Sequence, residues 1–422
     1  MADRDCARSS VATPARDSTT SDTESANQHG PFRIGIPGLL TLAIVYGYGR
    51  YGYGLFLPEL RREFGGSTGV LGAVSSAGYL AELLVLVVVA RLSGRRSPRV
   101  PVLIGGLCAA TGMVLMATAH STAVLAIGVA LAGTAPGWVW APYSDAVAVA
   151  TRPAARGHAL AMISTGTTFG VMVAGPAVLW VAGSGWRSIW LAAAACAIAV
   201  SAWNFRVLPA TAHPGPRGAG ARGDGATGLR WSALLRRPGQ RRLLGASFSV
   251  GLGGAVYWSY AGMAVSGAST EGAPLLWTLI GVAGVIGVAT GALVERWGMA
   301  KTFVTAQLCT ALSCGILALG RPTFAMFVAA AALFGAGFMV AGALVALWSA
   351  RAFADRPTVG FSVVVLALAA GSATGPAVFG ILVDSFDIPI AFAVLSMVVA
   401  ATLWFCPRRS DAYTPPDPQA HR

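Results

Sequence analysis

Two charged side chains lie inside long apolar stretches of this sequence. Arg50 follows the midpoint of a stretch over 36–58, and Glu82 lies in the second half of a stretch over 67–91. An ionised group among apolar residues is costly to desolvate, so each is a candidate for function. Arg50 would attract an anion, and Glu82 would take up and release a proton. The structural alternatives are an internal ion pair, or Glu82 extending toward a nearby arginine.

Aromatic residues accompany Arg50. Tyr46, Arg50 and Tyr53 are spaced so that they would share one face of a straight helix. Further aromatic residues occur in later apolar stretches, and the sequence favours a cavity that they line together. The alternative for any single ring is helix packing or a belt at a water interface. The later candidates are Trp140, Tyr143, Tyr257, Trp258 and Tyr260.

The sequence shows no pattern typical of a catalytic or metal site. It has no Walker phosphate loop, so direct use of ATP is not expected. The five histidines and six cysteines are scattered without metal-ligand spacing. The net charge of +13 comes from arginines spread between apolar stretches, not gathered in one stripe with aromatic residues. We therefore expect no enzyme activity, no metal, no cofactor and no nucleic-acid partner.

These residues must be positioned by helices that cross a membrane. Twelve apolar stretches of about 19–26 residues alternate with polar loops, and about 20 helical residues span the roughly 30 Å core of a bilayer. Hydrophobic residues make up 55% of the chain and charged residues 11%. The sequence predicts an all-α membrane protein with transmembrane helices over 36–58, 67–91, 101–119, 122–146, 158–182, 187–207, 243–266, 275–295, 302–320, 324–349, 359–384 and 388–406.

The basic residues predict the orientation. All 30 are arginine except Lys301, and most fall in the tails and in the loops that follow even-numbered spans. Basic loops face the cytoplasm, so both termini are expected there. The predicted organisation is a disordered cytoplasmic tail, a six-helix bundle, a cytoplasmic central loop, a second six-helix bundle and a cytoplasmic tail, over 1–33, 34–208, 209–242, 243–407 and 408–422.

Internal similarity indicates that the two bundles are copies of one unit. Gly175-Pro176-Ala-Val in the fifth span recurs as Gly375-Pro376-Ala-Val in the eleventh. The pattern Tyr-x-x-Tyr that ends at Tyr51 recurs in the seventh span, at a similar separation. An even number of spans in each copy makes the halves parallel, with a site expected at their interface.

With these features, residues 34–408 resemble the major facilitator superfamily. The family's loop motif, Gly-x-x-x-Asp-Arg-x-Gly-Arg-Arg/Lys, is matched by Gly291-Ala-Leu-Val-Glu295-Arg296-Trp-Gly298, with Glu in place of Asp and with Met299-Ala300-Lys301 in place of the basic pair. The first copy is weaker: it keeps Gly94-Arg95-Arg96, but Arg91-Leu92 occupies the acid–base positions. The Gly-Pro elements at Gly175-Pro176 and Gly375-Pro376 resemble one that is commoner in the family's antiporters.

The resemblance implies that the loop motif and an acid in span four form a latch on the cytoplasmic side. Such residues would switch the conformation rather than bind substrate, and solvated loop charges are the alternative. The candidates for gating are Arg91, Arg95, Arg96, Asp145, Gly291, Glu295, Arg296 and Gly298.

The function implied by the resemblance is secondary active transport of a small organic molecule by alternating access. Proton coupling is expected, and export is slightly favoured by the Gly-Pro element in span five. The alternatives are a proton-linked importer of a small anionic metabolite and a receptor that transports nothing. A monomer in the lipid bilayer of the inner (plasma) membrane is expected. No substrate follows from the sequence.

The predicted topology can be tested with reporter fusions. A reporter at 210–230 or at 410–420 should report the cytoplasm, and a reporter beside His120 should report the exterior, because basic loops remain inside. An external signal from the central loop would contradict the division into six plus six spans.

Overall fold

The protein is a bundle of helices in two groups. The structure is a computed structural model that describes residues 30–92, 97–180, 185–210, 238–265, 272–320, 323–353 and 357–408. Within these ranges, 11 helical segments have the length and apolar composition of a membrane span. A further helix, α11 (Pro238–Val265), has 28 residues. Its many Gly, Ser, Tyr and Trp residues make it less apolar than the others.

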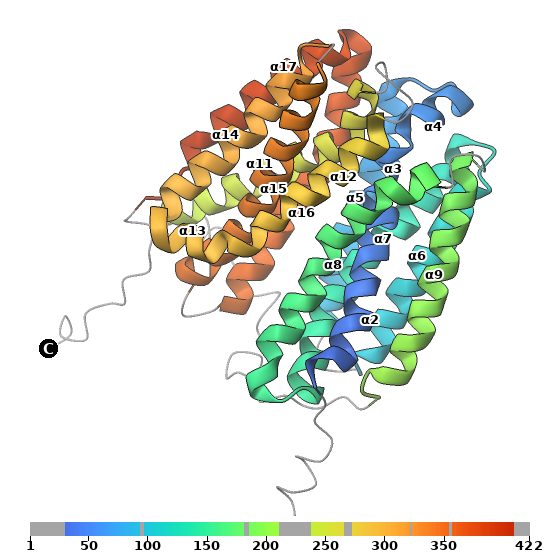
Figure 1. Cartoon of the computed structure of the whole chain (residues 1–422), viewed down its shortest axis with the longest axis vertical. Helices are drawn as coiled ribbons and strands as arrows, with labels where there is room; N and C mark the ends of the chain where they lie inside the picture. The colour runs from blue at the N-terminus through green and yellow to red at the C-terminus, as the bar shows by residue number, and fades with distance from the viewer. Residues whose placement is uncertain are drawn as a thin grey trace, which may run out of the picture.

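The first group of helices, blue to green in Figure 1, packs as one bundle. Its first membrane segment contains a π-helix and is followed by a short helix, α4 (Leu57–Phe64). The elements are α2 (Pro31–Ile44), η1 (Val45–Arg50), α3 (Gly52–Leu55), α4, α5 (Thr68–Leu92), α6 (Arg99–Ala117), α7 (Thr122–Ala150), α8 (Pro153–Trp180) and α9 (Gly185–Val207).

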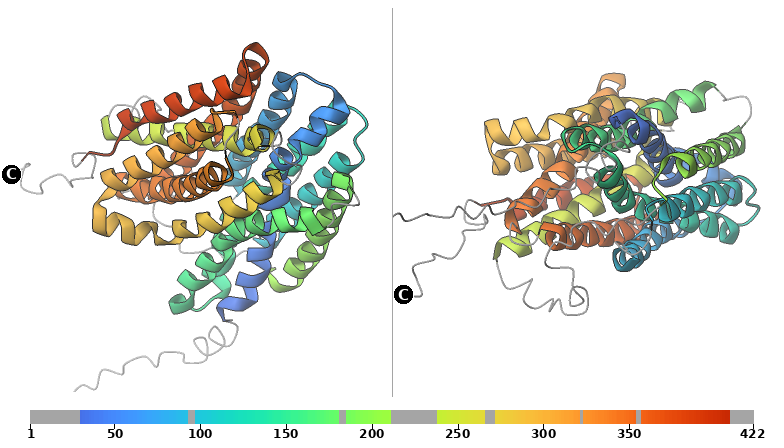
Figure 2. Two further views of the ribbon diagram at one scale, coloured as in Figure 1. Left: turned by 45° about the horizontal axis from the view of Figure 1, so that its top comes forward. Right: turned by 90° about the horizontal axis from the view of Figure 1, so that it is seen from below.

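The second group, yellow to red, forms a similar bundle beside the first (Figures 1 and 2). Its second membrane segment is also interrupted, here by a short 3₁₀ turn. The elements are α11, α12 (Gly272–Gly284), η2 (Val285–Ala289), α13 (Thr290–Trp297), α14 (Met299–Leu317), α15 (Phe324–Ala352), α16 (Pro357–Ser385), α17 (Ile388–Ala401) and η3 (Thr402–Phe405). Together the two bundles confirm the all-α membrane fold.

The helix boundaries differ from the predicted ones where proline begins a helix. The first helix begins at Pro31, inside the predicted tail, and α11 begins at Pro238, inside the predicted central loop. Proline is favoured in a first helical turn because its missing N–H has no partner there anyway. Residues 1–29, 211–237 and 409–422 lie outside the described residues, and the second of these ranges is most of the predicted central loop.

The two bundles meet closely at one end, where α5 begins and α16 ends. A Cβ atom added to Gly54 would lie 1.8 Å from the carbonyl oxygen of Trp258 in the other bundle. One added to Gly72 would lie 2.3 Å from the carbonyl oxygen of Pro376. Small residues let helix backbones approach in this way. Toward the opposite end the two groups of helices diverge (Figure 1).

Hydrogen bonds join the bundles at this closed end, which we define by Thr68, Gly69, Tyr260, Pro376 and Asp384. The Asp384 carboxylate of α16 accepts the backbone N–H groups of Thr68 (2.8 Å) and Gly69 (2.7 Å) at the start of α5. The Tyr260 hydroxyl of α11 lies 3.2 Å from the carbonyl oxygen of Thr68 and 3.0 Å from that of Pro376. A carboxylate at a helix N-terminus satisfies free N–H groups and interacts favourably with the helix dipole.

Removing the charge of Asp384 should weaken the closed end. In Asp384→Asn the two backbone N–H groups lose an anionic acceptor, which should destabilise the closed arrangement by about 1 kcal/mol. The population in which the two bundles have parted at this end should then rise about fivefold. Spin labels on Cys at His120 and Leu319, both exposed at this end, would report the change by pulsed EPR as a larger long-distance population. Asp387→Asn is the matched control, because Asp387 is exposed at the same end and its side chain makes no capping hydrogen bond. Equal distance distributions for the two variants would contradict the role of Asp384.

Candidate functional site

The two buried charges predicted from the sequence form a direct ion pair. The Arg50 guanidinium, at the end of η1, donates through Nη1 to Glu82 Oε2 on α5, and each side chain is 9% exposed. Along straight helices, the two residues would differ in depth by roughly 8 Å. The lengths of the two side chains and the π turn at η1, which places an extra residue in that turn, bring them together.

Three tyrosine rings surround the Arg50 guanidinium. Its central carbon lies 5.5 Å from the ring centroid of Tyr46, 5.8 Å from Tyr51 and 4.7 Å from Tyr79. The negative face of an aromatic ring attracts a cation, and this attraction is stronger where water is excluded. The rings therefore stabilise the positive charge beside its carboxylate partner. We call Arg50, Glu82 and these three tyrosines the ion-pair cage.

Two members of the cage, Tyr51 and Tyr79, were not among the candidates predicted from the sequence. Tyr79 precedes Glu82 by three residues, a spacing that places both on one helix face and was a usable signal. Tyr51 was noted only as part of a repeated pattern. Its ring reaches Arg50 because the helix is interrupted at this point, where the Tyr51 N–H bonds to the carbonyl oxygen of Tyr46 over 3.0 Å.

One side of the cage is accessible. The indole N–H of Trp140, on α7, donates to the Tyr46 hydroxyl over 2.6 Å, and Trp140 remains 37% exposed. The Nε atom of Arg50 is buried and has no hydrogen-bond partner in the described residues. The buried Nε donor of Arg50 thus lies behind the half-buried Tyr46 and the exposed Trp140.

Two other predicted residues of the first bundle lie away from the cage. The shared face of Tyr46, Arg50 and Tyr53 is not formed, because the π turn and the break at Tyr51 end the straight helix. The Tyr53 hydroxyl donates instead to the carbonyl oxygen of Leu71 over 2.8 Å. Tyr143 is buried, and its hydroxyl lies 2.8 Å from both Thr41 Oγ1 and Asn204 Oδ1.

The predicted tyrosines of α11 make packing and closing contacts. Tyr257 is buried, stacks on Phe334 with ring centroids 3.6 Å apart, and accepts a 3.0 Å hydrogen bond from Ser313. Tyr260 belongs to the closed end. Trp258, between them, stacks on Tyr51 of the cage at 4.2 Å. Of the aromatic residues predicted in this helix, Trp258 is the one that contacts the cage.

The predicted gating residues lie toward the opposite end of the bundles. Asp145, Glu295 and Arg296 are exposed, and the ion pairs among the described residues, Arg50–Glu82, Arg62–Glu59 and Arg187–Glu63, include none of them. Arg91 lies in the last turn of α5, but its side chain is outside the described residues. Arg95 and Arg96 also lie outside them.

The two glycines of the loop motif differ in their surroundings. Gly298 has a positive φ of 80° between α13 and α14, which explains why glycine stands there. A Cβ atom at Gly291 would meet nothing within 4 Å.

The two Gly-Pro elements occupy different interfaces. A Cβ atom at Gly175 would lie 2.0 Å from the carbonyl oxygen of Pro274, so this glycine permits α8 to approach α12 of the other bundle. Gly375 packs within its own bundle, against Leu252 of α11. Pro176 and Pro376 both lie inside helices.

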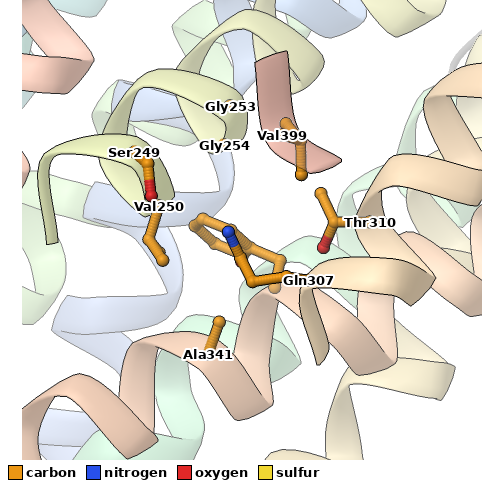
Figure 3. Close-up of a pocket in the computed structure, with 9 residues that line it drawn as sticks. Ser249, Val250, Gly253, Gly254, Gln307, Thr310, Ala341 and Val399 are labelled. Atoms are coloured by element: carbon orange, nitrogen blue, oxygen red, sulfur yellow. The ribbon is translucent and has the colours of Figure 1, made fainter. Parts of the chain in front are cut away.

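A small pocket lies inside the second bundle (Figure 3). Its volume is about 10 Å³, enough for about one water molecule. Its lining includes Gln307, Thr310 and Ser249, whose hydroxyl donates to a backbone carbonyl. The pocket is too small for an organic solute and lies apart from the ion-pair cage.

Comparison with known proteins identifies the family. The family model described as Major Facilitator Superfamily matches residues 39–348. The purine ribonucleoside efflux pump NepI of Shigella sonnei (strain Ss046) is 23% identical over 354 residues, covering 82% of this chain and 87% of the pump. NepI of Salmonella paratyphi C (strain RKS4594) is 23% identical over 363 residues, covering 83% and 89%.

Solved structures share the fold. The nucleoside transporter NupG superimposes with a TM-score of 0.72 at 11% identity, covering 89% of this chain and 97% of NupG. A bacterial homologue of the human lysosomal transporter Spinster, in an inward-facing and unoccupied conformation, gives 0.69 at 16% identity, covering 91% and 99%. The family match covers most of the chain, and the paired helix bundles agree with it. This chain belongs to the major facilitator superfamily and is a multi-pass membrane transporter.

Proposed function

We propose that this transporter exports a small organic solute in exchange for protons, with Glu82 as the proton carrier and Arg50 as the substrate anchor. The observation that carries the proposal is the buried ion pair between them. Removing one partner of such a pair leaves the other charge without compensation, at a cost of about 3–5 kcal/mol. Protonation of Glu82 would therefore change the partners of Arg50.

The surroundings of Arg50 support this exchange of partners. Its Nε atom is buried without a partner, and the Tyr46–Trp140 pair is the accessible side of the cage. A solute with a hydrogen-bond acceptor beside an aromatic ring would suit both features. Because Glu82 and the solute both act on Arg50, proton binding and solute binding change each other's affinity by the same factor. Exchange requires that each disfavours the other, so that the proton and the solute cross in alternate half-cycles.

The predicted orientation in the membrane determines which side of the membrane the site faces. With both termini in the cytoplasm, the closed end at Asp384 is external, and the diverging ends face inward. Asp145, Glu295 and Arg296 would then be exposed at the open cytoplasmic end and would form ion pairs when that end closes. In this proposal the structure is the inward-facing state of an alternating-access cycle in the inner membrane.

Purine ribonucleosides are the first solutes to test. Two relatives are purine ribonucleoside efflux pumps, and a purine offers both a flat ring for stacking and nitrogen acceptors for Arg50. Import of a small anionic metabolite is the alternative, in which Arg50 binds the anion directly. The two functions differ in the direction of proton-driven movement.

Transport by purified protein in liposomes should depend on both charges. Arg50→Ala should lower proton-driven inosine transport more than about tenfold, because a charge-assisted hydrogen bond contributes about 1.5–3 kcal/mol. Arg50→Lys should restore part of it, since lysine keeps the charge but loses the planar fork. Glu82→Gln should lose transport driven by a pH gradient and retain inosine exchange without a gradient.

Glu59→Gln is the matched control, because Glu59 also pairs with an arginine, Arg62, but at the surface. This control should transport normally. Normal gradient-driven transport by Glu82→Gln would remove Glu82 from the mechanism. If inosine is not transported but another solute is transported with the pH gradient, only the proposed substrate class is wrong.

A further inference from the structure

The ion-pair cage belongs to the first bundle, but two adjacent residues of the second bundle contact it. Trp258 stacks on Tyr51, with ring centroids 4.2 Å apart and an angle of 21° between the planes. The Ser259 hydroxyl lies 2.7 Å from Ser75 Oγ on α5 and also contacts the Tyr79 hydroxyl. Two of the three rings around Arg50 are therefore held from across the interface between the bundles.

The position of Trp258 is set by packing. It is 1% exposed, its indole N–H has no hydrogen-bond partner in the described residues, and its backbone lies against Gly54. Edge-on contacts with Trp277 at 5.7 Å and Phe334 at 5.4 Å support it from behind. The ring is thus a rigid surface that belongs to the second bundle and orients Tyr51.

These contacts can exist only while the closed end stays closed. Trp258 and Ser259 lie in α11, shortly before Tyr260, whose hydroxyl bonds to Thr68 and Pro376 at that end. If the bundles part there, Trp258 leaves Tyr51 and Ser259 leaves Ser75 and Tyr79. The tyrosine rings then lose the support that points them at the guanidinium.

We infer that Trp258 and Ser259 are positioning residues that couple protonation of Glu82 to closure of the external end. The inference rests on the proposed function, because it assumes that Glu82 is the proton carrier. When Glu82 is neutral, Arg50 depends on the tyrosine rings for its remaining stabilisation. The orientation of those rings requires the closed interface, so proton occupancy and closure must influence each other by the same factor.

In the part of the chain that the structure describes, no other acid or base forms an ion pair with Arg50 or Glu82. Among the described residues, Arg50 is the ion-pair partner of Glu82, and the titratable groups around the guanidinium are the phenols of Tyr46, Tyr51 and Tyr79. The groups that reach the cage from α7 and α11 are Trp140, Trp258 and Ser259, which do not titrate.

The test measures conformation rather than transport. The sample is full-length protein in which the six native cysteines are replaced and spin labels are attached at His120→Cys and Leu319→Cys. Pulsed EPR at a series of pH values, from acid to alkaline, gives the ratio of molecules with a closed external end to molecules with a parted one. We expect this ratio to change with pH in the otherwise unaltered protein and to be constant in Glu82→Gln. Trp258→Leu and Ser259→Ala should reduce the pH-dependent change at least about threefold, while Trp258→Phe, which keeps a smaller stacked ring, restores part of it.

Matched controls separate coupling from general damage. Trp348→Phe removes part of a buried indole of the same bundle that packs on Phe303, away from the cage. Ser247→Ala removes a buried hydroxyl of α11 that donates only within its own helix. Both should keep the full pH response. If Trp258→Leu does not fold, Ser259→Ala and Trp258→Phe decide the question.

The outcomes distinguish this inference from the proposed function. A protein whose ratio does not respond to pH, or whose response survives Glu82→Gln, refutes Glu82 as the proton carrier and the inference with it. A response that depends on Glu82 but is unchanged in both Ser259→Ala and Trp258→Phe overturns the inference alone.

Discussion

An arginine and a glutamate buried among apolar helices impose the main constraint on this protein. Each charge alone would be very costly to remove from water, and their attraction offsets that cost only in a close geometry with further polar support. The structure meets this requirement with a π turn that ends at Arg50 and with tyrosine rings on both helices. The first membrane segment is therefore irregular where a purely structural helix would be straight.

The interface between the bundles is the second constraint, and it is uneven. At one end, glycines remove the side chains that would hold backbones apart, and Asp384 and Tyr260 form hydrogen bonds with backbone N–H and carbonyl groups at the start of α5. Toward the other end, the exposed residues Asp145, Glu295 and Arg296 form no ion pair with one another. Since helix packing in lipid gains little from the hydrophobic effect, close contacts and hydrogen bonds decide which end is closed.

The ion-pair cage and the closed end are physically continuous. The Tyr51–Trp258 stack lies at the cage, Ser75 and Ser259 meet beside it, and the backbone of Ala377 donates to Ser76 over 3.0 Å one residue further along α5. A change of charge at Glu82 thus occurs next to the contacts that hold the bundles together. This placement is a physical basis for linking a proton to a movement of helices.

Sequence alone determined the properties that depend on composition and on local order. Apolar length predicted the membrane fold, repeated patterns predicted two halves, motifs indicated the family, and charge within an apolar stretch singled out Arg50 and Glu82. These inferences need no knowledge of which helix faces which, because the cost of desolvating a residue follows from its type and from the run that contains it.

Only the tertiary structure decided which residues meet. In the structure, Tyr51 and Tyr79 lie around Arg50 and the predicted Tyr53 does not, because a π turn changes the direction of every later side chain in that helix. The structure placed Tyr143 and Tyr257 in buried packing contacts and joined Asp384 to Thr68 across 316 residues of chain. Such contacts depend on the rotation and approach of whole helices, and these are set by all of their neighbours together rather than by any local pattern.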